Sequence, residues 1–146
     1  MNYNIEVANI KDIDAIYNLQ KNHEHILISK EALKSDLSSS SYIYFVAKMA
    51  NKIIGCVGCS VLFDHIDISI LITDIDYLNK GIASTLLEKL IQYIKEKNIE
   101  KIFLEVRMSN YKAIKLYEKY NFKQISIRKN YYKDTNEDAL VYMLEI

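Results

Sequence analysis

The stretch LEVRMSN, which begins at Leu104, places three polar side chains where an apolar strand is expected to end. Glu105 lies between Leu104 and Val106, and a carboxylate that is partly shielded in this way can act as a general base, directly or through water. A simpler interpretation also fits these residue types. Glu105 and Arg107 lie two apart on one face of a strand and could form a salt bridge, and Asn110 could cap a helix.

A second candidate site is the turn DYLNKGIAS, residues 76–84, which precedes a long segment of helical periodicity. Gly81 lets the backbone approach a ligand closely, and the small residues Ala83 and Ser84 leave the approach open. The first amides of a helix have no partners within the helix and carry the positive end of its dipole, which suits a phosphate or pyrophosphate. Lys80 adds positive charge. The stretch could also be only a turn, because one glycine is a weak signal.

Two cysteines, Cys56 and Cys59, form a single C-x-x-C motif inside a β-branched run. Residues three apart on a strand point to opposite faces and lie ~10 Å apart, beyond the ~7 Å limit for a disulfide. We therefore expect two reduced cysteines rather than a thiol redox centre, and no metal site, since no further ligands are evident. His23 and His25 lie in a polar stretch and are expected to be solvated loop residues.

The composition is typical of a soluble globular protein, and we expect one domain over residues 1–146. The 19 basic and 19 acidic residues cancel, so no overall field draws the chain to nucleic acid or to an anionic membrane. No apolar run approaches the length of a membrane span, and the first residues lack the layout of a signal peptide. The expected location is the cytoplasm.

Hydrophobic periodicity predicts the elements that must position these residues. The expected strands are 3–7, 42–49, 52–63, 67–73, 101–106, 123–130 and 138–146, and the expected helices are about 12–21, 30–38, 82–97 and 111–120. Ser29 is the expected N-cap of the second helix. Ala50-Asn51 and Asp64-His65 are the expected hairpin turns.

This order of elements predicts an α/β (α+β) fold. Antiparallel hairpins lead into a central β-α-β crossover, so the twisted sheet must be mixed and mostly antiparallel. Helices should cover both of its faces.

Together, these motifs resemble the GNAT superfamily of acetyl-CoA-dependent N-acetyltransferases, and within it the RimI-like branch of ribosomal-protein alanine N-acetyltransferases. The resemblance rests on the x-x-x-G-x-A turn, LEVRMSNYKAIKLYEKYNF (104–122), RKNYY (128–132) and EDALVYM (137–143). It covers essentially the whole chain and implies the GNAT fold, which agrees with the order of elements. The chain departs from the family pattern at Leu78, where Arg or Gln is usual, and at ILIS (26–29), where the branch carries Pro-Trp-Ser.

The resemblance implies acetyl-CoA as co-substrate and no metal. The pyrophosphate would lie on the turn before the long helix, and the pantetheine arm would pair with a strand edge as an extra strand would. For this, the parallel strands 67–73 and 101–106 must diverge at their carboxyl ends. The cofactor-binding residues implied in this way are Leu71, Ile72, Thr73, Asn79, Lys80, Gly81, Ile82, Ala83, Ser84 and Asn110.

The resemblance also implies the catalytic residues. The Glu of LEVR and the Tyr of LYE, here Glu105 and Tyr117, would be the base that frees an amine and the acid that protonates the departing thiolate. Tyr117 shares a helix stripe with Ala113 and Ile114, so we expect it to face the sheet.

The acceptor is expected to be the N-terminal α-amine of a protein, such as a ribosomal protein, and the chain a monomer or weak dimer. The alternatives are a small amine (a polyamine, an amino acid or a drug) and a non-catalytic acetyl-CoA-binding module. RKNYYKD (128–134) is expected to be an acceptor-site loop rather than a nucleic-acid contact. Tyr131 and Tyr132 would then wall a channel for an extended peptide end.

Overall fold

The computed structural model of the chain describes residues 1–25 and 27–146, so Ile26 of the ILIS segment lies outside the described residues. The strands are β1 (Asn4–Val7), β2 (Tyr42–Met49), β3 (Lys52–Val61), β4 (His65–Thr73), β5 (Lys101–Arg107), β6 (Lys123–Tyr132) and β7 (Glu137–Glu145). The helices are α1 (Ile13–Asn18), α2 (Lys30–Leu37), α3 (Ile82–Glu96) and α4 (Tyr111–Lys119), with 3-10 turns η1 (Ile10–Asp12) and η2 (Ile75–Tyr77). The predicted order of strands and helices is confirmed.

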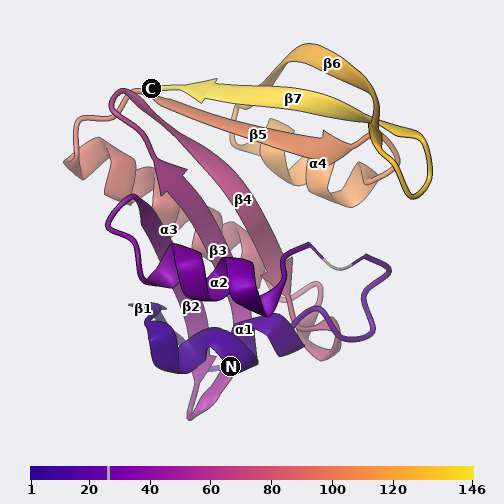
Figure 1. The fold of residues 1–146 in the computed structure, drawn as a ribbon. Coiled ribbons are helices and arrows are strands. Elements are labelled where there is room, and N and C mark those ends of the chain that lie inside the picture. Colours follow the sequence, from indigo (N-terminus) through magenta and orange to yellow (C-terminus); the bar gives the residue numbers. More distant parts are fainter. Residues whose placement is uncertain (26) are drawn as a thin grey trace.

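The described strands form a seven-stranded sheet in the order β1-β2-β3-β4-β5-β7-β6 (Figure 1). Neighbouring strands are antiparallel except β4 and β5, which run parallel. The parallel pair follows from the β4-α3-β5 crossover, because a helix that returns along the sheet brings the next strand back in the same direction. The prediction of a mixed, mostly antiparallel sheet is confirmed.

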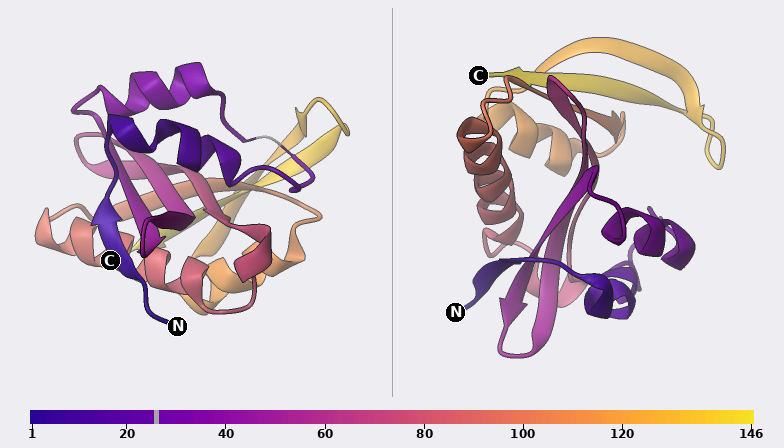
Figure 2. Two further views of the ribbon diagram at one scale, coloured as in Figure 1. Left: turned by 90° about the horizontal axis from the view of Figure 1, so that it is seen from below. Right: turned by 60° about the vertical axis from the view of Figure 1, so that its left-hand side comes forward.

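Helices cover both faces of the sheet, as predicted (Figure 2). Among the described residues, no helix is long and apolar enough to cross a membrane. On one face, Leu86 of α3 packs in a core that includes Leu104. On the other, Ile16 of α1 belongs to a second core. Cys59 lies in the first core and Cys56 in the second, so the two free cysteines point to opposite faces, as expected.

The strands β4 and β5 pair only over His65–Asp67 and Lys101–Phe103, and beyond these residues they diverge. A β-bulge follows directly: the register with β3 shifts at Gly58 and leaves Ser69 as an extra residue, whose hydroxyl donates to the Gly58 carbonyl (3.1 Å). A bulge increases the local twist and bends its strand, which accounts for the separation from β5. The expected divergence of the parallel strands is confirmed.

One expected turn is displaced by a residue. The prediction of a turn at Asp64-His65 was wrong, because the N–H of Leu62 donates to the carbonyl of His65 (2.9 Å) and centres the turn on Phe63-Asp64. The ring of His65 then packs edge-on against Phe103, with centroids 5.1 Å apart. Backbone pairing of His65 with Lys101 of β5 places it within β4.

Candidate active site

A cleft of ≈ 680 Å³ opens beside the diverging end of β4, between the start of α3 and the inner side of α4. The predicted cofactor-binding residues that line it are Leu71, Ile72, Thr73, Asn79, Gly81, Ile82, Ala83, Ser84 and Asn110. Lys80 is not among its lining residues. Of the two predicted catalytic residues, Tyr117 lines the cleft and Glu105 does not.

The turn before α3 leaves its backbone amides accessible. Gly81 is the N-cap residue and has the left-handed φ of 79°, and Asn79 also has a positive φ, 62°. Among the described residues no side chain caps the helix, and the first turn holds no acidic residue. A Cβ at Gly81 would meet no atom within 4 Å. The helix start is therefore open to an anion, which its dipole favours.

Beyond Asp67, the edge of β4 that faces the cleft has no strand partner among the described residues. The N–H of Asp74 donates towards β3, to the carbonyl of Ile54 (2.9 Å), and peptide groups alternate in direction along a strand. The peptide groups of Leu71 and Thr73 therefore point away from β3, on the side where β5 has diverged. The carbonyl of Thr73 lies 2.7 Å from Nε2 of His23.

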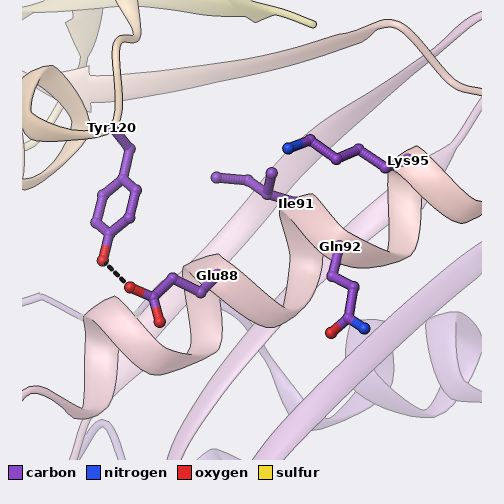
Figure 3. Close-up of a pocket in the computed structure, with 5 residues that line it drawn as sticks. All are labelled: Glu88, Ile91, Gln92, Lys95 and Tyr120. Atoms are coloured by element: carbon purple, nitrogen blue, oxygen red, sulfur yellow. Dashed lines mark hydrogen bonds between the residues drawn. The ribbon is translucent and has the colours of Figure 1, made fainter.

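The helix α4 is fixed at both ends. Asn110 caps it, because its Oδ1 accepts from the N–H of Ala113 (3.3 Å), and the residue also lines the cleft. At the other end, the hydroxyl of Tyr120 donates to the carboxylate of Glu88 on α3 (Figure 3). These contacts hold Tyr117 at a set position relative to the turn before α3.

Tyr117 reaches the cleft from α4 and is 7 % exposed. Its ring packs against Phe122, with centroids 5.5 Å apart, in the core between α4 and the sheet. The expectation that Tyr117 faces the sheet is therefore confirmed. Burial raises the pKa of its hydroxyl well above the ordinary value, with a smaller effect of Tyr132. A phenol carries its proton at neutral pH, so the hydroxyl can act as a donor.

Glu105 lies on the opposite face of the sheet. Leu104 and Val106 are buried in the core with α3, and side chains alternate along a strand, so Glu105 points to the other side of β5. Its Oε2 lies 3.1 Å from Nε of Arg128 on β6. The two predicted catalytic residues therefore flank the sheet from opposite faces, near the point where β4 and β5 diverge.

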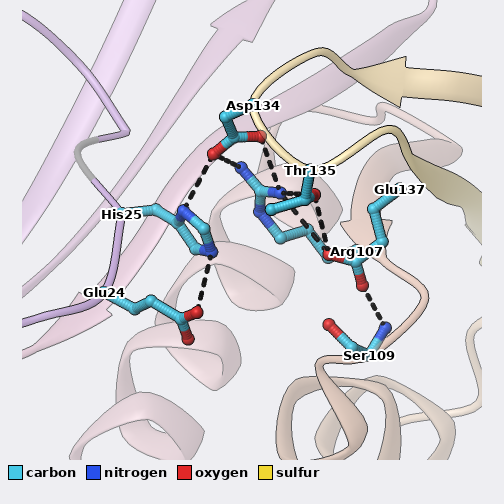
Figure 4. A network of polar contacts seen from close by, with 7 residues as sticks. All are labelled: Glu24, His25, Arg107, Ser109, Asp134, Thr135 and Glu137. Atoms are coloured by element: carbon cyan, nitrogen blue, oxygen red, sulfur yellow. Dashed lines mark hydrogen bonds and ion pairs between the residues drawn. The ribbon is translucent and has the colours of Figure 1, made fainter.

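Arg107 is the centre of a polar network at the mouth of the cleft (Figure 4). Its guanidinium donates to both oxygens of Asp134 (3.2 and 3.1 Å) and lies 3.5 Å from Glu137. The pKa of Asp134 is lowered, mainly by the hydrogen bond from Arg107. The pKa of Glu137 is also lowered, mainly by hydrogen bonds from Ser109. Arg107 pairs with these carboxylates instead of Glu105, so the interpretation of a Glu105–Arg107 salt bridge is wrong.

The connection between α1 and α2 brings two histidines to the cleft. They are loop residues, as predicted, but they are only partly exposed and contact other segments instead of being fully solvated. His23 contacts the edge of β4, as described above. Nδ1 of His25 lies 3.1 Å from Oδ2 of Asp134, and the His25 side chain is 23 % exposed (Figure 4). The His25–Asp134 pair joins the α1–α2 connection to the β6–β7 turn. No local sequence pattern could have predicted this pair, because His25 and Asp134 lie far apart in the sequence.

The segment RKNYYKD was expected to be a loop, but most of it is the end of β6, followed by a turn. The strand extends because pairing with β7 resumes at Tyr132 after an irregularity. Tyr131 and Tyr132 contact each other edge to face, with centroids 5.1 Å apart. Burial raises the pKa of Tyr132, and the charge of Glu105 adds to the shift. The guanidinium carbon of Arg107, which lines the cleft, lies 4.0 Å from the centroid of the Tyr132 ring, so Tyr132 is close to the mouth of the cleft.

The geometry defines a class of protein. An open helix start and a strand edge that β5 leaves uncovered lie in one cleft and suit a long phosphate-bearing carrier. A buried phenol beside them suits transfer of a group from that carrier. The described residues hold no group of three or more His, Cys, Asp or Glu side chains placed to bind a metal ion.

The acetyltransferase (GNAT) family model matches residues 10–122, and the chain belongs to this family of acyltransferase enzymes. A ribosomal protein bS18-alanine N-acetyltransferase of Escherichia coli (strain K12) is 31% identical over 137 residues, 92% of each chain. The crystal structure of the ribosomal-protein-S18-alanine N-acetyltransferase from Escherichia coli has a TM-score of 0.93 and 30% identity, covering 99% of this chain and 94% of that one. A GNAT family acetyltransferase from Elizabethkingia anophelis, solved with acetyl-CoA bound, has a TM-score of 0.79 and 26% identity over 99% of each chain. The resemblance to the family and its RimI-like branch is confirmed.

Proposed function

We propose that this enzyme transfers the acetyl group of acetyl-CoA to the N-terminal α-amine of a protein, with an alanine of the ribosomal-protein type as the leading acceptor. The observation that carries the proposal is the divergence of β4 and β5 beside an uncapped helix start. The acceptor class is supported by relatives that are named for alanine acetylation of a ribosomal protein.

The groups that line the cleft fit acetyl-CoA. The amides of residues 79–84 would receive the pyrophosphate, with Lys80 as a nearby charge. The open edge of residues 71–73 would pair with the amides of the pantetheine arm. The bound co-substrate supplies an acetyl thioester. Nε2 of His23 contacts the carbonyl of Thr73 at 2.7 Å. When the arm binds at this edge, the carbonyl would either accept from both groups or lose its contact with His23.

The transfer makes two proton demands on the protein. The ammonium form of the acceptor must lose a proton before its nitrogen can bond to the thioester carbon, and the sulfur gains a proton as the C–S bond breaks. The nitrogen loses a second proton as the amide forms, and this proton would restore the one that the acid gives to the sulfur. Glu105 would take the first proton, directly or through water, and Tyr117 would give the sulfur its proton. The phenol of Tyr117 carries its proton at neutral pH, and the raised pKa that burial causes means that the proton leaves only together with the breaking of the C–S bond. Since the two residues flank opposite faces of the sheet, acceptor and donor would approach from opposite sides.

The turnover of acetyl-CoA against a panel of acceptors tests the proposed function. The panel holds peptides that begin with alanine, serine or methionine, the small amines spermidine and lysine, and an Nα-acetylated alanine peptide as the blank. We expect the alanine peptide to be acetylated most efficiently, at its α-amine, as located by mass spectrometry. Faster transfer to a small amine would contradict the acceptor, and no transfer to any amine would contradict the proposed function.

Gly81→Asp should weaken CoA binding roughly ten- to thirtyfold, because it places a negative charge at the helix start that is proposed to hold the pyrophosphate. Gly81→Asn is the matched control: it has a similar shape, tolerates the positive φ of 79° and carries no charge. Calorimetry with CoA measures both variants. Equal affinities of the two variants would contradict a phosphate site at this turn.

A further inference from the structure

The predicted base is already paired with a cation. Oε2 of Glu105 lies 3.1 Å from Nε of Arg128. The two residues come from β5 and β6, and β7 lies between these strands. On β7, Val141 lies opposite Glu105 and Ala139 lies opposite Arg128. Because alanine is small, the Arg128 side chain can cross β7 at this position and reach the carboxylate.

The contact is exposed and reversible. The side chain of Arg128 is 60% exposed and that of Glu105 is 31% exposed, and ion pairs of this exposure are weak and screened by salt. Arg128 also has a second contact, because its guanidinium carbon lies 5.6 Å from the centroid of the Tyr131 ring. The guanidinium can therefore leave Glu105 without losing every partner.

The other guanidinium on this face is not available for the same exchange. The Arg107 side chain is 14% exposed and is held by Asp134 (3.1 Å) and Glu137 (3.5 Å). Among the described residues, Arg128 is thus the exchangeable cation at Glu105.

On the basis of the proposed function, we propose that Arg128 is a positioning residue that occupies the acceptor's place on Glu105 and yields it to an incoming α-ammonium group. Both groups are cations whose N–H groups donate to a carboxylate, so Glu105 stays paired throughout the exchange. A neutral, acylated N-terminus cannot displace the guanidinium, and the exchange therefore selects free N-termini. Once Glu105 has taken the amine's proton and released it to solvent, the guanidinium returns and the neutral amide product loses its place.

Arg128→Gln should tighten the binding of a peptide with a free α-amine. Removal of the competing cation should raise affinity about two- to fivefold, the size of an exposed ion pair, and lower KM by a similar factor without raising kcat. The affinity should also fall more steeply with salt than that of the wild type, because the ammonium then forms a new ion pair instead of replacing one. Arg128→Lys keeps the charge and should return to wild-type values.

Calorimetry on the protein saturated with CoA measures binding apart from turnover, because CoA carries no acetyl group. The probe is an alanine-initiated peptide. Its counterpart, in which hydrogen replaces the α-amino group, should bind Arg128→Gln and the wild type equally. Lys129→Gln makes the same charge change at the exposed neighbour on β6 and is the matched protein control.

Unchanged or weaker binding of the amine peptide by Arg128→Gln would overturn the proposal. If this variant also had a lower melting temperature, the role of Arg128 would be to stabilise the contact between β6 and β5. Equal shifts for both peptides, the same shift in Lys129→Gln, or no binding of the amine peptide by any variant would also overturn the proposal. A wild-type enzyme that binds the peptide without acetylating it would contradict the proposed function instead. In that case the binding comparison would still decide the role of Arg128.

Discussion

Replacement of Tyr117 by Phe should lower acetyl transfer ~10²–10⁴-fold, the usual contribution of a positioned general acid. The substitution removes the hydroxyl and keeps the ring that packs against Phe122. The open helix start at Gly81 lies on α3 and is untouched, so CoA affinity and melting temperature should stay close to the wild type. A loss confined to the rate is the result expected of an acid.

The rate is measured in single turnovers with acetyl-CoA already bound, and CoA affinity is measured by calorimetry. Tyr111→Phe is the matched control, because it removes a hydroxyl from the same helix, where Tyr111 is 72% exposed and is not among the residues that line the cleft. A wild-type rate in Tyr117→Phe would mean that Tyr117 only packs in the core. Loss of rate in Tyr132→Phe instead would assign the acid to Tyr132, whose ring contacts Arg107 at the mouth of the cleft.

The parts of the site that could be predicted from the sequence are encoded locally. Gly81 and the helix that follows it form an uncapped helix start, the candidate anion site, within one turn of chain. The alternation of Leu104, Glu105 and Val106 separates buried from accessible faces of β5, and helical spacing turns Tyr117 towards the sheet. In each case the information lies within a few residues, so a period of 2 or 3.6 is enough to find it.

The contacts that join distant segments could not be predicted in this way. Spacing alone suggested that Glu105 pairs with Arg107, but the strand order β5-β7-β6 brings Arg128 across to Glu105 and the β6–β7 turn to Arg107. Periodicity does not encode strand order. The bulge that separates β4 from β5 did have one local signal: Gly58 lies within a strand, where glycine indicates a bulge or close packing. A Cβ there would lie 2.3 Å from the ring of Tyr44.

Replacement of Glu105 by Gln should lower turnover ~10²–10⁴-fold at a pH near ~7, and progressively less as the pH rises. A peptide α-amine has a pKa of ~8, so near neutral pH most of it is ammonium and needs a base before it can attack. Above that pKa the amine is already free. The deficit of the variant should therefore shrink as the pH passes through this range.

A structural role for Glu105 predicts a different result. If the carboxylate only tied β5 to β6 through Arg128, Glu105→Gln would lower the melting temperature and leave a pH–rate profile parallel to that of the wild type. Arg128→Gln is the matched control, because it breaks the same 3.1 Å contact and keeps the carboxylate. The three profiles, measured with one peptide and with both substrates saturating, decide between the roles. If the pH–rate profile of Glu105→Gln runs parallel to that of the wild type, Glu105 is not the base. If Glu105→Gln loses rate at low pH and Arg128→Gln does not, Glu105 is the base and Arg128 is its partner in the free enzyme.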